Sequence, residues 1–142
     1  MSNGREIGGK TLGLVGFGSI GQLTAKLGQA MGMQALAYDA MLSASDPVFA
    51  HTGVRGMALD ELLTHVDVVS LHVPLVDSTR NLFDAQRIAA MQPGAVLINT
   101  SRGGIVDEAA LAAALKSGKL GGAALDVFAS EPLAANAAFA AC

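Results

Sequence analysis

Short apolar runs that alternate with helical patterns constrain the fold of this chain more than any other feature. Five runs lack charged residues except for one aspartate and are rich in Val, Leu, Ile and Ala: 11–16, 34–38, 66–71, 95–99 and 122–125. Strands separated by helices imply right-handed crossovers and a parallel sheet with helices on both faces. The sequence therefore predicts a single α/β domain, a doubly wound parallel sheet in three layers (αβα).

Helices are predicted between these runs, over 20–31, 60–65, 84–91 and 107–115. Asp84 and Asp107 can cap the last two, and Gly32 and Gly118 are suited to end helices. In the first helix, apolar residues recur at spacings of three and four, which predicts the face that packs on the first strand. These residues are Ile20, Leu23, Leu27 and Met31. The segment 40–56 is predicted to be a connection, with a short edge strand near 54–57.

Composition excludes several classes of protein. With 142 residues, 51% of them hydrophobic, 15% charged and 17 glycines, the chain is expected to be one packed domain rather than disordered. A net charge of −3 provides no basic face for nucleic acid. Uncharged stretches are too short to span a bilayer, and residues 1–10 contain no signal sequence. Cys142 is the only cysteine, which favours a reducing, cytoplasmic location and excludes an intrachain disulfide.

A GxGxxG pattern formed by Gly16, Gly18 and Gly21 stands where the first strand passes into the first helix. In this context the first glycine permits a tight turn, the second lets the backbone approach a pyrophosphate, and the third lets helix and strand pack closely. The helix N-terminus, with Ser19 and Ile20, offers free N–H groups to phosphates. The pattern predicts a Rossmann-type dinucleotide site.

Asp39 follows the second strand, 18 residues after Gly21 (39 minus 21), where a carboxylate can accept hydrogen bonds from a ribose. The same carboxylate would repel a 2′-phosphate, and no Arg or Lys follows it before Arg55. The preferred cofactor is therefore NAD rather than NADP. In the alternative interpretation, the glycines serve only a tight turn and Asp39 merely ends a strand. A Gly-rich turn also suits adenosylmethionine, but a methyltransferase leaves the motif around Arg102 unexplained.

The later strand ends carry three further motifs: 70–75 (SLHVPL) followed by 78–81 (STRN), 99–108 (NTSRGGIVDE), and 124–128 (ALDVF) with 131–132 (EP). Arg102 could bind a carboxylate or an oxyanion with two hydrogen bonds, and Gly103-Gly104 keeps the approach to it open. Asp126 could accept a hydrogen bond from a carboxamide.

Together these motifs resemble the D-isomer-specific 2-hydroxyacid dehydrogenases, and most of all their D-3-phosphoglycerate dehydrogenase branch. The resemblance covers residues 9–132. It implies a linker or the end of a preceding helix at 1–10, an NAD-binding domain at 11–132 and a truncated Ala-rich tail at 133–142, with no substrate-binding domain. It also implies a homodimer.

The resemblance also implies roles for single residues. Arg102 matches the arginine that binds the carboxylate and carbonyl of a 2-oxo acid, and Glu131 the glutamate that pairs with a catalytic histidine. Asp126 resembles the aspartate that contacts nicotinamide, and Asp39 the one that binds the adenosine ribose. The remaining cofactor residues are expected to be Val73 and Pro74 at the adenine side, Thr79 in the segment that follows, and Thr100 and Ser101 beneath the nicotinamide.

The family's catalytic histidine lies in a Pro-His pair beyond the glutamate, and this chain has no such pair. His72 is expected to be a packed residue rather than a catalytic one. His51 and His65 lack zinc-like spacing and are expected at the surface, so no metal site is predicted. Two interpretations remain: the NAD-binding domain of a 2-hydroxyacid dehydrogenase that has little activity alone, or a non-catalytic, NAD(H)-responsive binding or dimerisation module.

Overall fold

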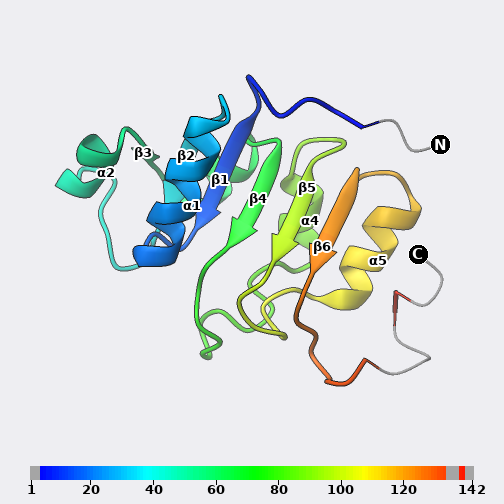
Figure 1. Cartoon of the computed structure of the whole chain (residues 1–142). Coiled ribbons are helices and arrows are strands. Elements are labelled where there is room, and N and C mark those ends of the chain that lie inside the picture. The colour runs from blue at the N-terminus through cyan, green and yellow to red at the C-terminus, as the bar shows by residue number, and fades with distance from the viewer. Residues whose placement is uncertain (1–3, 134–137, 140–142) are drawn as a thin grey trace.

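The computed structural model describes residues 4–133 and 138–139. Its elements are β1 (Thr11–Val15), α1 (Ser19–Ala30), β2 (Gln34–Tyr38), α2 (Pro47–Thr52), β3 (Arg55–Gly56), α3 (Leu59–Leu63), β4 (Val68–Leu71), α4 (Ala85–Ala90), β5 (Val96–Asn99), α5 (Glu108–Lys116) and β6 (Gly122–Leu125). The strands form one parallel sheet in the order β3-β2-β1-β4-β5-β6 (Figure 1). The predicted doubly wound α/β fold is confirmed.

The strand order reverses between β1 and β4. The chain moves outward from β1 to β3, then crosses to the other side of β1 and moves outward again to β6. In such sheets, ligands bind at the carboxyl ends of the strands beside the point of reversal. This topology places the glycine-rich turn after β1 next to the end of β4.

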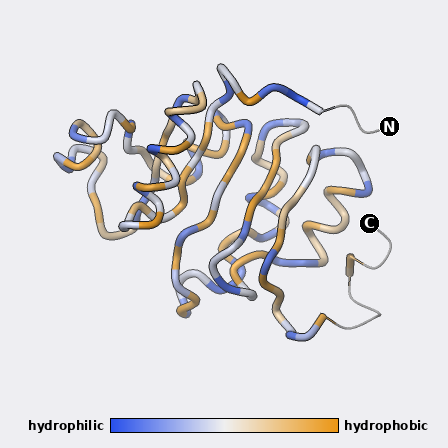
Figure 2. The backbone as a smooth tube through the Cα atoms, viewed as in Figure 1, coloured by the Kyte–Doolittle hydropathy of each residue, from blue (hydrophilic) through white to orange (hydrophobic). Residues whose placement is uncertain are grey.

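Two hydrophobic cores hold the layers together. On one face of the sheet, α1 and α2 bury a smaller core that includes Leu14 and Phe49. On the other, α3, α4 and α5 bury a larger core that includes Leu71, Leu97 and Leu111. Figure 2 shows the hydrophobic positions along β4 and β5. Most residues of the central strands are apolar, as is usual in a parallel sheet, which is normally covered on both faces.

Helix α1 covers only part of its face of the sheet. In Figure 1, α1 lies over β1 and β2, and no helix of the described residues lies over the same face of β4, β5 and β6. The N-terminal segment crosses one end of this face, where Arg5 donates a hydrogen bond to the carbonyl oxygen of Gly94. Residues 4–10 form no helix.

The predicted packing face of α1 is wrong. Its apolar stripe points outward: Ile20 is 63% exposed and Leu27 is 56% exposed. The sheet instead contacts the small residues Gly21, Ala25 and Gly28. A side chain at position 28 would bring its Cβ within 2.8 Å of Cδ2 of Leu12. Because α1 lies so close to β1, only residues with little or no side chain fit between them.

The connection predicted at 40–56 contains a helix that the sequence interpretation missed. Asp46 caps α2 by accepting a hydrogen bond from the N–H of Val48, and Pro47 occupies its first turn. Gly53 ends the helix with φ of +69°. Asp, Pro and Gly at these positions are ordinary helix-boundary signals. The edge strand expected near 54–57 is confirmed as β3.

Two substitutions on α1 test which face packs on the sheet. Leu27→Ala should change the free energy of unfolding by less than about 0.5 kcal/mol, because the side chain is exposed. Ala25→Leu should destabilise the chain by about 1–3 kcal/mol, because Ala25 fills its space. Urea unfolding measures both at a protein concentration low enough to keep the chain monomeric, so that loss of a subunit contact does not contribute. A loss of about 2–5 kcal/mol for Leu27→Ala would instead indicate a core leucine.

Candidate functional site

The glycine turn between β1 and α1 has no room for side chains at two of its three glycines. Gly16 has φ of +98°, and a Cβ there would collide with the carbonyl oxygen of His72 at the end of β4. At Gly21 a Cβ would collide with the carbonyl oxygen of Gly16. At Gly18, by contrast, a Cβ would meet nothing within 4 Å. The protein itself therefore does not require glycine at position 18, whereas a closely bound ligand would.

The start of α1 suits an anion. Gly18 occupies the N-cap and makes no side-chain capping bond, and the first turn contains no acidic residue. Ser19 and Ile20 are exposed there. Free N–H groups at the start of a helix of 12 residues, together with its dipole, favour a phosphate group. The residues of this turn thus fit the pyrophosphate of a dinucleotide.

Asp39 is bound to the same turn. Its Oδ2 accepts a hydrogen bond from the N–H of Phe17 at 2.8 Å, and its Oδ1 accepts one from the N–H of Met41, also at 2.8 Å. Phe17 is buried and stacks on Phe49 with a ring-centroid distance of 5.3 Å. The carboxylate is therefore fixed beside the glycine turn, and its remaining lone pairs can accept from a ribose.

The segment after β4 forms a wall next to this turn. Val73 is half-buried and Pro74 is exposed. Thr79 closes the loop, because its hydroxyl donates to the carbonyl oxygen of Pro74 and accepts from the N–H of Val76. The Thr79 hydroxyl thus has internal partners and shapes the loop that carries Pro74.

His72 lies against the glycine turn, next to Gly16 and Gly21, and is half-buried. Its Nε2 is 2.8 Å from Oγ of Ser70 in a hydrogen bond, and burial lowers the pKa of its imidazole. The ring is therefore mainly neutral at pH 7 and is held toward the sheet face covered by α1. His51 and His65 are exposed, as expected. No group of three or more potential metal-ligating side chains occurs among the described residues.

Arg102 lies on the loop that follows β5. Its side chain is exposed, and Nη1 donates to the carbonyl oxygen of Ser101 at 2.7 Å. Thr100 is exposed beside it. The loop rests on Asn99, which is 2% exposed and was not singled out from the sequence. The sequence signal that could have identified Asn99 is an amide residue that ends an apolar run directly before a glycine-rich loop.

Asp126 and Glu131 lie on the next loop, after β6, and both are exposed. Oε1 of Glu131 accepts from the N–H of Phe128 at 2.9 Å. Oε2 of Glu108, at the start of α5, accepts from the N–H of Ala129 at 2.6 Å. No sequence pattern connects Glu108 with this loop, because Glu108 and Ala129 are 21 positions apart.

The loops of Arg102 and Glu131 are in direct contact. A Cβ at Gly103 would collide with the carbonyl oxygen of Phe128. The N–H of Asp126 donates to the carbonyl oxygen of Asn99 at 3.1 Å. The structure therefore brings the two predicted catalytic side chains onto neighbouring, mutually packed loops at the carboxyl ends of β5 and β6.

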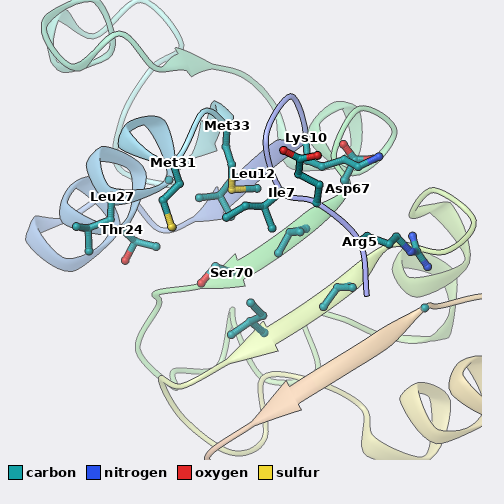
Figure 3. Close-up of a pocket in the computed structure, with 16 residues that line it drawn as sticks. Arg5, Ile7, Lys10, Leu12, Thr24, Leu27, Met31, Met33, Asp67 and Ser70 are labelled. Atoms are coloured by element: carbon teal, nitrogen blue, oxygen red, sulfur yellow. The ribbon is translucent and has the colours of Figure 1, made fainter. Parts of the chain in front are cut away.

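A hollow of about 610 Å³ lies on the partly covered sheet face rather than at the glycine turn (Figure 3). Leu12, Val68 and Ile98 contribute from the strands, and Leu27 and Met31 from the side of α1. The hollow is mainly apolar, and the charged residues that line it, Arg5, Glu6, Lys10 and Asp67, precede β1 or β4, at the amino ends of the strands. We therefore place the candidate site at the carboxyl ends of the strands.

Comparisons with known proteins identify the family of this chain. The model for the family "D-isomer specific 2-hydroxyacid dehydrogenase, NAD binding domain" matches residues 1–142. The (S)-sulfolactate dehydrogenase of Chromohalobacter salexigens is 53% identical over 133 residues, which are 94% of this chain and 43% of that protein. The D-3-phosphoglycerate dehydrogenase of Synechocystis is 47% identical over 132 residues, 92% of this chain and 23% of that protein.

A solved structure leads to the same family. It is the D-isomer specific 2-hydroxyacid dehydrogenase of Lactobacillus delbrueckii ssp. bulgaricus in its NAD-complexed form, with a TM-score of 0.82 and 39% identity. The match covers 89% of this chain and 38% of that one. This chain thus spans less than half the length of these three relatives. None of the helices described could cross a membrane. The chain belongs to the D-isomer-specific 2-hydroxyacid dehydrogenases and corresponds to their NAD-binding domain.

Proposed function

We propose that this domain holds NAD(H) across the strand ends for hydride transfer between NAD(H) and a small 2-hydroxy or 2-oxo acid in the complete enzyme. The observation that carries the proposal is the open space at Gly18. This space lies beside a helix start without a side-chain capping bond and next to the fixed carboxylate of Asp39.

A lone cysteine in the sequence supports a reducing, cytoplasmic location.

The two halves of the cofactor would have different partners. On the adenosine side, the carboxylate of Asp39 accepts from the ribose, and Val73 and Pro74 flank the adenine. Gly16, Gly18, Ser19, Ile20 and Gly21 surround the pyrophosphate, and Thr79 supports the wall. On the nicotinamide side stand Thr100, Ser101 and Asp126. Dinucleotides bind across the point where the strand order reverses, which is consistent with this division.

Arg102 is the proposed substrate-binding residue. Its guanidinium can hold the carboxylate of a 2-oxo acid and polarise the carbonyl group beside it. NADH, when bound, supplies the hydride that reduces the carbonyl carbon. The carbonyl oxygen then needs a proton, and Glu131 can orient an imidazole that donates it.

This chain does not supply that imidazole from its described residues. His51 and His65 are exposed on other elements, and His72 is hydrogen-bonded to Ser70. Loss of a general acid costs about 100- to 10,000-fold in rate. We therefore propose that the chain alone binds cofactor and has little activity.

Asp39→Ala tests the cofactor site. The isolated chain should bind NADH in a saturable manner and NADPH more weakly, because the Asp39 carboxylate repels a 2′-phosphate. The substitution should weaken NADH binding about tenfold, the effect of losing hydrogen bonds to a charged group, and reduce the preference for NADH. Fluorescence titration measures both. Equal binding of NADH and NADPH by the unmodified chain would contradict the assignment of Asp39.

Arg102→Gln tests the substrate role without requiring turnover. A small 2-oxo acid at millimolar concentration should strengthen NADH binding to the unmodified chain by up to about fivefold, the contribution of one exposed ion pair. The Arg102→Gln chain should still bind NADH but show no such increase. Arg55→Gln, on another exposed arginine, in β3 at the far edge of the sheet, is the matched control. An increase that survives Arg102→Gln would contradict the proposed role.

A homodimer is also proposed, and the outward stripe of α1 supports it. Four large apolar side chains lie more than half exposed on one helix: Ile20, Leu23, Leu27 and Met31. A twofold interface lets such a stripe pack against its own copy. Sedimentation analysis should find a dimer that Leu27→Asp dissociates and Val76→Asp, at an exposed position on another loop, does not. A monomeric unmodified chain, or a dimer unaffected by Leu27→Asp, would contradict this interface.

A further inference from the structure

Asn99 combines burial with polarity in an unusual way for the end of a strand. Ser70 and Asn99 are the two buried polar or charged residues among those the structure describes. The residues before Asn99 in β5 are Val96, Leu97 and Ile98. Burial of an amide is unfavourable unless its hydrogen-bonding groups are satisfied. The partners of this amide therefore indicate why it is there.

Every side-chain partner of Asn99 belongs to the loop that follows. Oδ1 accepts from the N–H of Ser101 at 3.1 Å and from its Oγ at 3.0 Å. Nδ2 donates to the carbonyl oxygen of Arg102 at 2.9 Å. One side chain thus fixes the main chain on both sides of the Ser101–Arg102 peptide link. Of the common short side chains, Asn supplies both the acceptor and the N–H donor, whereas Asp lacks the donor.

The loop that Asn99 holds is also pressed against the next one. The main-chain carbonyl of Asn99 accepts from Asp126, and Gly103 lies against the carbonyl of Phe128. A shift of the Ser101–Arg102 link would therefore disturb both loops. The adenosine side of the site, built by the glycine turn and Asp39, has no hydrogen bond to Asn99 among the described residues.

We propose that Asn99 is a positioning residue that holds Thr100, Ser101 and Arg102 against the nicotinamide end of the bound cofactor. This inference rests on the proposed function, in which Thr100 and Ser101 contact the nicotinamide half. It requires that the loss of the Asn99 amide weaken recognition of that half alone. A residue that merely stabilised the fold would affect both halves equally.

Binding of NADH and of ADP-ribose, which lacks the nicotinamide, separates these roles. Isothermal titration calorimetry on the 142-residue chain gives both dissociation constants. Asn99→Ala should weaken NADH binding about five- to tenfold, as expected from the lost hydrogen bonds, and ADP-ribose binding less than about twofold. Ser70→Ala, at the other buried polar position, should leave the ratio of the two constants unchanged.

Asn99→Asp keeps the size of the side chain and the acceptor for Ser101 but loses the donor to Arg102. It should also weaken NADH selectively, and it provides a second test if Asn99→Ala does not fold, as judged by circular dichroism. Equal weakening of both ligands, or no change in either, would overturn the positioning role. If the unmodified chain binds ADP-ribose and NADH equally, the loop does not contact nicotinamide and the inference fails while the adenosine site stands. If it binds neither, the proposed function fails first.

Discussion

The contact between Gly16 and the main chain of His72 is the constraint on which the site depends. It joins the ends of β1 and β4, the two strands between which the sheet order reverses. Because glycine carries no side chain at positions 16 and 21, the backbone can turn within three residues and begin α1 at Ser19. The helix start then faces the strand ends, and the free space at Gly18 is left for a ligand. The proposed phosphate site is thus a consequence of close packing.

The other half of the site depends on main-chain contacts between loops rather than on glycine packing alone. The N–H of Asn81, after β4, donates to the carbonyl of Gly104 at 2.8 Å, and the loops after β5 and β6 are joined through Asn99 and Gly103. Three loops from three strands therefore form one assembly around Arg102. A side chain on any one loop is placed accurately only if the others are in place, which is why a buried amide such as Asn99 can affect a site that it does not touch.

The sequence predicted those parts of the structure that depend on local chemistry. The five main strands, the capping of α4 by Asp84 and of α5 by Asp107, and the end of α1 at Gly32 follow from short patterns, and the structure agrees to within two residues. Contacts between distant segments were not predictable. Glu108 binds the N–H of Ala129 across two loops, and the N–H of Phe17 reaches Asp39 across 22 positions, so neither pairing has a local signature.

The wrong prediction of the packing face of α1 has a physical cause. Periodicity identifies an apolar face, but it does not say what that face packs against. On α1, glycine and alanine permit the closest approach to β1, so the large apolar residues are displaced to the flank, next to the bare face of β4 and β5. A parallel sheet normally has both faces covered. The apolar residues of this chain therefore form both an internal core and an exposed apolar surface. The stripe of α1, which the sequence interpretation assigned to the core, belongs to the exposed surface.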